Sequence, residues 1–388
     1  MTGLLGTLAR GIGADDTVRE ITQQPSVWRD IDGIVAASRA ALDGFLRPLV
    51  ARDHLRVVLT GAGTSSFAGQ LLATTLARRL GRRVDAVSTT DIVADPRGCF
   101  AEDLPTLLVS FARSGDSPES VAATELAEQC LSEVHHLVIT CNEQGQLARE
   151  HSGRTTSYVL LMPPESNDRG FAMTSSFTGM TLAALLALGG APYAGVAERL
   201  AQAAERVLHD TVLGENLDAL LARAPERIIY LGSGALRALA AESALKVLEL
   251  TGGAIVATSD SALGFRHGPK AVLNERAVVI VYVSNDPYTR RYDLDILAEL
   301  RTTMAPGSVI VIEAGDGGPT DEASWRLDGA GDLEDAALAL PAVVHAQLIG
   351  LKAAVLQGVR PDNPFPSGEV NRVVHGVILH PFQHPFEH

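Results

Sequence analysis

The sequence predicts an α/β protein built from two tandem doubly wound domains, each a parallel sheet with helices on both faces, after a helical N-terminal arm. Short, continuously apolar and β-branched runs such as "VVLT" (57–60), "LLVSF" (107–111) and "HLVIT" (136–140) alternate with helical stretches. Runs of this kind are typical of strands covered on both sides. The chain has 388 residues, too many for one ordinary core, and it contains an internal repeat.

The repeat is visible in two strand–turn–helix segments. "RVVLTGAGTSSFAGQLLATTLA" (56–77) is similar to "RIIYLGSGALRALAAESALKVL" (227–248), with Gly61 aligned to Gly232 at an offset of 171 residues. The same offset places 107–120 over 278–291, 136–143 over 307–314, and Gly179 over Gly350. Coincidence at four places along one offset indicates a tandem duplication.

Three segments follow from this order of elements. Residues 1–45 are expected to form the helical N-terminal arm. Residues 46–200 are expected to form the first domain, with the boundary near "GGAPYAGVAERL" (189–200). Residues 201–388 are expected to form the second domain and a C-terminal tail.

Composition limits the classes of function. The formal net charge is −14, which disfavours nucleic acid and acidic membranes as partners, and no helix-turn-helix flanks the two copies. The three cysteines have no CxxC spacing, so neither a disulfide framework nor a zinc site is expected. The N-terminus has no charged region before an apolar run, and "GMTLAALLALGG" (179–190) is too short to span a bilayer. We therefore expect a soluble cytoplasmic protein.

Two polar turns follow predicted strands in the first copy. Because both fall at the carboxyl edge of the sheet and both precede helices, their backbone N–H groups and hydroxyls can hold a phosphate. The candidate substrate-binding residues are Gly63, Thr64, Ser65 and Ser66 in the first turn, and Arg113, Ser114, Gly115, Asp116 and Ser117 in the second.

Two alternatives remain open for these turns. Ser, Thr and Asp are also ordinary helix N-caps. "GAGTSS" is in addition a partial dinucleotide motif in which Ser66 replaces the third glycine, with Asp85 or Asp91 near the ribose position. The second copy lacks the Thr–Ser pair and the serine–glycine turn, so one phosphate site per chain is expected.

Candidates for acid–base chemistry lie in the second copy. Glu242, Lys246 and Glu249 share one face of a predicted helix whose other residues are mostly Ala and Leu. They form either a solvated salt-bridge face or a buried general base with its partners. His267 lies in the loop "ALGFRHGPK" (262–270) and either transfers protons or is an ordinary surface histidine.

The C-terminus carries four histidines, His375, His380, His384 and His388. The last three, in "HPFQHPFEH" (380–388), are spaced like a metal-binding tract, but the prolines and the terminal position favour disorder or simple packing. No metal site and no cofactor are predicted.

Eight motifs in order carry a resemblance to a known family. They are "EITQQPSVW" (20–28), "GAGTSSFAG" (61–69), "SFARSGDSPES" (110–120), "CNEQGQLAR" (141–149), "RGFAMTSSFTGM" (169–180), "ESALKVLEL" (242–250), "RHGPK" (266–270) and "PDNPFPSGEVNRVVHG" (361–376). The chain resembles the two-domain sugar isomerase (SIS) proteins. Within them it is most similar to proteins assigned as tagatose-6-phosphate ketose/aldose isomerases or galactosamine-6-phosphate deaminases. The isomerase half of glucosamine-6-phosphate synthase is more distantly similar.

The resemblance implies a fold of two flavodoxin-like SIS domains and a sugar-phosphate substrate. It implies that the two polar turns hold the phosphate and that Met173 and Thr174 line the sugar. It also implies that Glu249 moves a proton between C1 and C2, and that His267, lent by a neighbouring subunit, opens the ring. A homodimer or higher homo-oligomer with a shared active site is therefore expected.

Three departures from the synthase pattern stand out. The family's C-terminal lysine is absent, and His375 occupies about the aligned position as a candidate substitute. Arg113 stands where the synthases have glutamine. The chain has no glutaminase domain, so release of ammonia from a hexosamine 6-phosphate, giving a ketose 6-phosphate, is the expected activity. Aldose–ketose isomerisation without deamination and a non-catalytic sugar-phosphate sensor are the alternatives.

Overall fold

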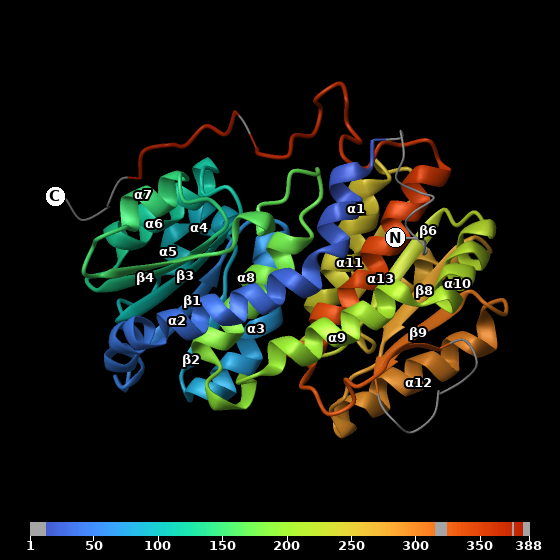
Figure 1. The fold of residues 1–388 in the computed structure, drawn as a ribbon, viewed down its shortest axis with the longest axis horizontal. Coiled ribbons are helices and arrows are strands. Elements are labelled where there is room, and N and C mark those ends of the chain that lie inside the picture. The colour runs from blue at the N-terminus through green and yellow to red at the C-terminus, as the bar shows by residue number, and fades with distance from the viewer. Residues whose placement is uncertain (1–12, 315–323, 375, 383–388) are drawn as a thin grey trace.

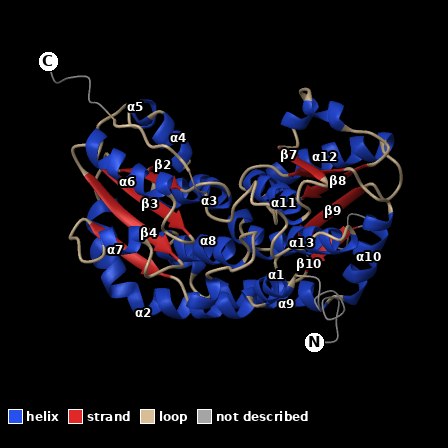
Figure 2. Cartoon of the chain, turned by 90° about the horizontal axis from the view of Figure 1, so that it is seen from above, coloured by secondary structure: helices blue, strands red, loops and turns tan. Residues whose placement is uncertain are grey.

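Two five-stranded parallel sheets stand at opposite ends of the molecule, with a layer of helices between them (Figures 1 and 2). The structure is a computed structural model that describes residues 13–314, 324–374 and 376–382. Each sheet belongs to one copy of the repeat. The predicted α/β class with two doubly wound units and a helical arm is confirmed.

The sheet of copy one has the strand order β2-β1-β3-β4-β5. Its strands are β1 (Arg56–Thr60), β2 (Arg83–Ala86), β3 (Thr106–Ala112), β4 (Val134–Thr140) and β5 (Ser157–Leu161). Strands β1 and β3 are buried at every residue and pair in parallel up to Thr60 opposite Ser110. The two polar turns therefore leave the sheet side by side.

The sheet of copy two repeats this order as β10-β9-β8-β6-β7. Its strands are β6 (Arg227–Leu231), β7 (Val256–Asp260), β8 (Ala277–Tyr282), β9 (Val309–Ala314) and β10 (Ser324–Leu327). Strand β6 begins 171 residues after β1, and β8 begins 171 residues after β3. The offset read from the sequence is therefore the offset between equivalent strands.

Helices flank the sheets. In copy one they are α3 (Thr64–Leu80), α4 (Thr89–Ala94), α5 (Pro96–Cys99), α6 (Pro118–Cys130), α7 (Gln146–His151) and α8 (Ser175–Leu188). After it come α9 (Val196–His209), α10 (Thr211–Ala222), α11 (Leu236–Leu250), α12 (Pro287–Thr303) and α13 (Asp335–Leu356). Four 3-10 turns complete the set: η1 (Pro164–Ser166), η2 (Ala191–Tyr193), η3 (Gly264–Arg266) and η4 (Pro269–Val272).

The N-terminal arm joins the two copies. It consists of α1 (Asp15–Thr22) and the long helix α2 (Gln24–Val50), which packs on α8 and on α9. The Arg29 guanidinium pairs with the carboxylates of Glu198 and Glu205 on α9, each at 2.6 Å. One continuous helix thus crosses from copy one toward copy two.

The contact that positions the functional site is between α3 of copy one and α11 of copy two. Helix α13 covers the other side of α11, and Gly350 permits the approach because a Cβ there would lie 3.2 Å from the Lys246 carbonyl oxygen. Among the described residues, α13 is the one helix long and apolar enough to cross a membrane, and 94% of its apolar window is buried inside the protein. Its apolar character is therefore accounted for by the core.

A C-terminal tail, residues 357–382 as far as the structure describes them, leaves α13 and runs over copy one (Figure 1). The Asp362 carboxylate accepts hydrogen bonds from the Thr17 N–H and hydroxyl, both at 2.7 Å. Farther along, the Arg97 guanidinium lies over the Phe382 ring, 5.2 Å from its centroid. The tail is thus held at α1 and at α5.

Candidate active site

The first polar turn, between β1 and α3, is shaped by glycines. Gly61 approaches Ser65 so closely that a Cβ on Gly61 would lie 2.6 Å from the Ser65 Cβ. Gly63 has φ +54°, a left-handed conformation that favours glycine. Among the described residues, no side chain caps the N-terminus of α3, where Thr64, Ser65 and Ser66 are buried. The N–H groups of Ser65 and Ser66 donate to the carbonyl oxygens of Ala62 and Gly63. The Thr64 N–H, the hydroxyls and the helix dipole therefore remain available to an anion.

The second polar turn, between β3 and α6, has the same character. Gly115 has φ +70°, and the Ser117 side chain at the N-cap position makes no capping hydrogen bond to the helix backbone. The Ser117 hydroxyl instead lies 2.6 Å from that of Ser120. The Asp116 carboxylate accepts from the Gln146 N–H at 2.9 Å, at the start of α7. Two open helix N-termini thus adjoin one sheet edge, and Asp116 supports the loop beside them.

Buried hydroxyls at this edge have no hydrogen-bond partner within the described chain. They belong to Thr60 at the end of β1, Ser110 opposite it on β3, and Thr89 at the start of α4. Buried polar groups in native proteins are nearly always satisfied by protein, water or ligand. Their concentration beside the two turns indicates a site for a polar ligand.

Helix α11 brings an ionised cluster against the first turn. The Lys246 ammonium donates to the Glu249 Oε2 at 2.5 Å and to the Thr64 Oγ1 at 3.0 Å, and lies 3.4 Å from the Glu242 Oε1. Glu242 and Lys246 are fully buried, whereas the Glu249 side chain is 24% exposed. The solvated salt-bridge alternative is therefore wrong. A carboxylate of copy two is held beside the first polar turn of copy one.

Burial sets the protonation of this cluster. It raises the pKa of Glu242 to about 8. Burial alone would lower the pKa of Lys246, but the carboxylates of Glu242 and Glu249 outweigh it and the pKa is raised. Lys246 therefore remains an ammonium at neutral pH. Glu249, with its partly exposed carboxylate, is the member of the cluster that a substrate can reach.

Arg113 lies at the end of β3, and its residue surface is only 6% exposed. Its Nη2 donates to the Arg372 carbonyl oxygen at 2.9 Å, while its Nε and Nη1 have no partner among the described residues. Burial and then the charge of Arg372 lower the pKa of Arg113. A buried guanidinium with unused donors is a second indication of an anionic ligand.

The segment expected to line the sugar begins α8. Thr174 is fully buried and donates through its N–H and its hydroxyl to the Asp168 carboxylate, at 2.8 and 3.3 Å. Ser175 and Ser176 donate to the same carboxylate. Met173 is half-buried. The Asp168 carboxylate thus fills the N-terminus of α8, which holds this segment in place.

His267 makes no hydrogen bond or ion pair with these site residues within the described chain. His267 is exposed in the loop between η3 and η4 after edge strand β7. Arg266 and Lys270 beside it both pair with Glu299 on α12. His375 lies outside the described residues, as do His384 and His388.

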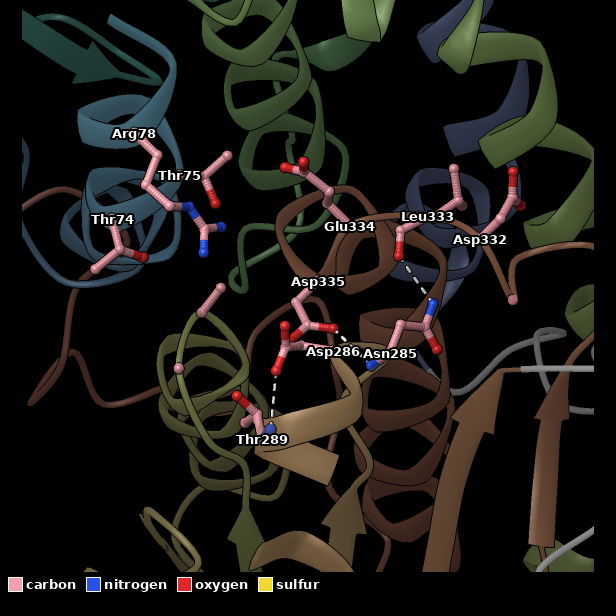
Figure 3. A pocket seen from close by; sticks show the side chains of 13 residues that line it. Thr74, Thr75, Arg78, Asn285, Asp286, Thr289, Asp332, Leu333, Glu334 and Asp335 are labelled. Atoms are coloured by element: carbon pink, nitrogen blue, oxygen red, sulfur yellow. Dashed lines mark hydrogen bonds between the residues drawn. The ribbon is translucent and has the colours of Figure 1, made fainter. Parts of the chain in front are cut away.

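The equivalent edge of copy two holds a cavity of about 440 Å³, shown in Figure 3. It is lined by Gly234, Asn285, Asp286 and residues 331–335, together with Thr74, Thr75 and Arg78 of α3. Gly234 has φ +57° and aligns with Gly63 at the repeat offset. The turn geometry has therefore been kept in copy two.

At this second edge, carboxylates of the protein itself accept hydrogen bonds from the backbone amides. Asp286 accepts hydrogen bonds from the N–H groups of Tyr288 and Thr289 at 3.0 and 2.8 Å. These bonds lower the pKa of Asp286, and the bond from Thr289 has the larger effect. Asp335 accepts from the Asn285 N–H at 2.9 Å (Figure 3). Because the protein supplies its own anions, this edge does not suit a phosphate.

The sequence indicated the two polar turns and the Glu242–Lys246–Glu249 face, where a lysine at i+4 and i−3 to glutamates in an Ala/Leu-rich helix was a usable signal. It gave no role to Arg372, whose guanidinium donates to the Asp168 carbonyl oxygen. No periodicity in the tail could have predicted that contact.

The SIS domain model matches this chain twice, at residues 50–189 and 220–357. An AgaS protein of Streptomyces coelicolor is 71% identical over 381 residues, covering 98% of this chain and 99% of that protein. The D-galactosamine-6-phosphate deaminase AgaS of Escherichia coli is 45% identical over 378 residues, covering 95% and 96%. More distantly, the glutamine–fructose-6-phosphate aminotransferase of Pseudomonas putida is 27% identical, and the match covers 57% of its length.

Among solved structures, the tagatose-6-phosphate ketose/aldose isomerase of Escherichia coli superposes with a TM-score of 0.86 at 41% identity, covering 97% of this chain and 99% of that one. The two SIS matches include both polar turns and α11. The chain belongs to the SIS domain family, with two SIS domains in tandem.

Proposed function

We propose that this protein deaminates a hexosamine 6-phosphate, with galactosamine 6-phosphate as its substrate and tagatose 6-phosphate and ammonia as its products. The observation that carries the proposal is the hydrogen-bonded chain from Thr64 through Lys246 to Glu249. It joins an anion-binding helix N-terminus to a partly exposed carboxylate. The name of the 45%-identical Escherichia coli relative supports the choice of substrate.

The phosphate is bound at the N-termini of α3 and α6. The Thr64 N–H, the hydroxyls of Thr64, Ser65 and Ser117, and the two helix dipoles all favour an anion. Holding the phosphate fixes the far end of a six-carbon sugar, so that C1 and C2 come to the Glu249 side. Met173 and Thr174 at the start of α8 are proposed to line the sugar between these ends.

Glu249 acts as the base. It takes the proton from C2 of the open-chain 2-amino aldehyde while the C1 oxygen gains a proton, which gives an enolamine. Return of the proton to C1, with loss of the nitrogen-bound proton, leaves a ketimine at C2 and a hydroxyl on C1. Water adds to the ketimine carbon, and the C–N bond breaks to release ammonia and the ketose. Lys246 orients the Glu249 carboxylate through their hydrogen bond. General-base catalysis of this kind contributes roughly 10²–10⁴-fold in rate.

Isomerisation without deamination is the second candidate, because the Escherichia coli structure with 41% identity bears the name of a ketose/aldose isomerase. The same base and enediol chemistry serves both reactions, and only the group on C2 differs. Purified protein should be incubated with galactosamine 6-phosphate, glucosamine 6-phosphate and tagatose 6-phosphate, assaying ammonia and sugar isomers. Ammonia from galactosamine 6-phosphate supports the proposal. Isomerisation of tagatose 6-phosphate without any ammonia supports the second candidate, and binding without conversion supports a sensor.

We further propose that the active site is shared between two copies of the chain in a cytoplasmic homodimer. His267 is exposed and lies after the edge strand β7, so a second copy can supply it to open the sugar ring. Hybrid dimers of Glu249→Gln and His267→Ala chains should then regain activity, because one of their two sites is intact. Hybrids that stay as inactive as the parent variants would contradict the shared site.

A further inference from the structure

Arg113 is the most incompletely satisfied cation in the described chain. Only 6% of its surface is exposed, and its Nε and Nη1 donate to no described residue. Removing a guanidinium from water without giving it partners costs several kcal/mol. Such a group persists where a ligand completes it.

The nearby carboxylates do not complete it by direct bonds. Asp168 is already occupied by three N–H groups and two hydroxyls at the start of α8. Glu249 accepts from Lys246 at 2.5 Å. Both charges ease the burial of Arg113 from a distance, but its free donors face neither carboxylate at hydrogen-bond range.

A second arginine contacts the first through its backbone. Arg372, in the C-terminal tail, accepts the Arg113 Nη2 hydrogen bond through its carbonyl oxygen at 2.9 Å. Its own side chain reaches the Asp168 carbonyl oxygen, and its charge is among the causes that lower the pKa of Arg113. Two like charges placed together repel unless an anion lies between or beside them.

We propose that Arg113 and Arg372 together bind the phosphate group of the substrate, and that this phosphate fixes the C-terminal tail over copy one. The inference rests on the proposed sugar-phosphate site and adds two charged ligands to it. Guanidinium donors suit a phosphate dianion because their N–H groups match its oxygens. The tail, otherwise anchored through Asp362 and Phe382, is then a substrate-dependent cover.

Calorimetry with inorganic phosphate tests this without any catalytic reaction. Arg113→Gln and Arg372→Gln should each bind phosphate and galactosamine 6-phosphate roughly tenfold to a hundredfold more weakly than the wild type. Arg113→Lys should fall between. Arg97→Gln is the matched control, because it removes the tail contact at Phe382 but no proposed ligand. Unphosphorylated galactosamine should show no difference among these proteins.

Hydrogen exchange of the tail supplies the second measurement. Phosphate should slow exchange in residues 366–374 of the wild type and of Arg97→Gln, but not of Arg372→Gln. Because Arg372 is exposed, its substitution leaves the fold intact even if Arg113→Gln does not fold. Wild-type phosphate affinity in Arg372→Gln, or a tail unaffected by phosphate, would overturn the inference. Loss of affinity in a protein that converts no hexosamine phosphate would uphold it and refute the proposed function alone.

Discussion

At the scale of single residues, Lys246 is the centre of the site. It is a fully buried ammonium that lies between Glu242 and Glu249 of its own helix and the Thr64 hydroxyl of the other copy. The sequence placed these glutamates and this lysine on one face because their spacing is helical. Only the packing of α11 on α3 turned that face inward, and such packing between distant segments is not readable from spacing.

Replacing Lys246 should therefore be costly. Lys246→Met leaves Glu242 and Glu249 without their shared cation, and breaking a buried ion pair destabilises by about 3–5 kcal/mol. Lys270→Met is the matched control, because Lys270 pairs with Glu299 at the surface, where a pair contributes about 0–1 kcal/mol. Urea unfolding of both variants measures the difference. Equal free energies of unfolding would mean that the cluster is not a buried ion pair.

At the scale of elements, the repeat of strands, glycine turns and helices was readable from the sequence because short apolar runs and turn glycines have strong local signals. The tail was not, since its path depends on contacts such as Asp362 with α1 and Arg372 with Arg113. The sequence also did not predict that carboxylates of copy two accept hydrogen bonds from the backbone amides at its own sheet edge. Asp286 and Asp335 look like ordinary caps in the sequence and become meaningful only when copy two is superposed on copy one.

One element pair predicts a pH response. The ring centroids of His136 on β4 and His151 on α7 lie 4.4 Å apart. Burial is the main cause that lowers the pKa of each histidine to about 4. Glu128 lies 3.2 Å from the His136 Nε2 without hydrogen-bond alignment, and Arg154 pairs with that carboxylate. Both histidines are therefore neutral in the folded protein near pH 6, where an unfolded histidine begins to gain a proton.

The direction of the pH dependence of stability follows from the difference between the folded and unfolded pKa of these histidines. The folded pKa is below the unfolded value of about 6.5, so stability is complete above pH 6.5 and is lost as the pH falls toward 4. Relative to His136→Leu, the wild type should lose up to about 1.4 kcal/mol of unfolding free energy per pH unit in this window. Urea unfolding from pH 7 to 4 measures it, with the exposed His54→Leu as control. Parallel pH profiles of wild type and His136→Leu would refute the neutral pair.

At the scale of the whole molecule, the two copies have divided the work. Copy one keeps two open helix N-termini, while copy two fills the N-terminus of α12 and the turn before it with Asp286 and Asp335 and contributes Glu249 from α11. Titration with inorganic phosphate should therefore give one site per chain. Asp286→Asn should leave this stoichiometry and affinity unchanged, because Asp286 belongs to the edge without a phosphate. Two phosphates per wild-type chain would contradict the division.

The central claim is that Glu249 of copy two performs proton transfer on a sugar phosphate held by copy one. The most direct test is the turnover of galactosamine 6-phosphate by the wild type and by Glu249→Gln, measured as ammonia and tagatose 6-phosphate released. We predict equal amounts of both products from the wild type. Glu249→Gln should bind phosphate normally but turn over roughly 10²–10⁴-fold more slowly. Near-native turnover by Glu249→Gln would contradict the claim.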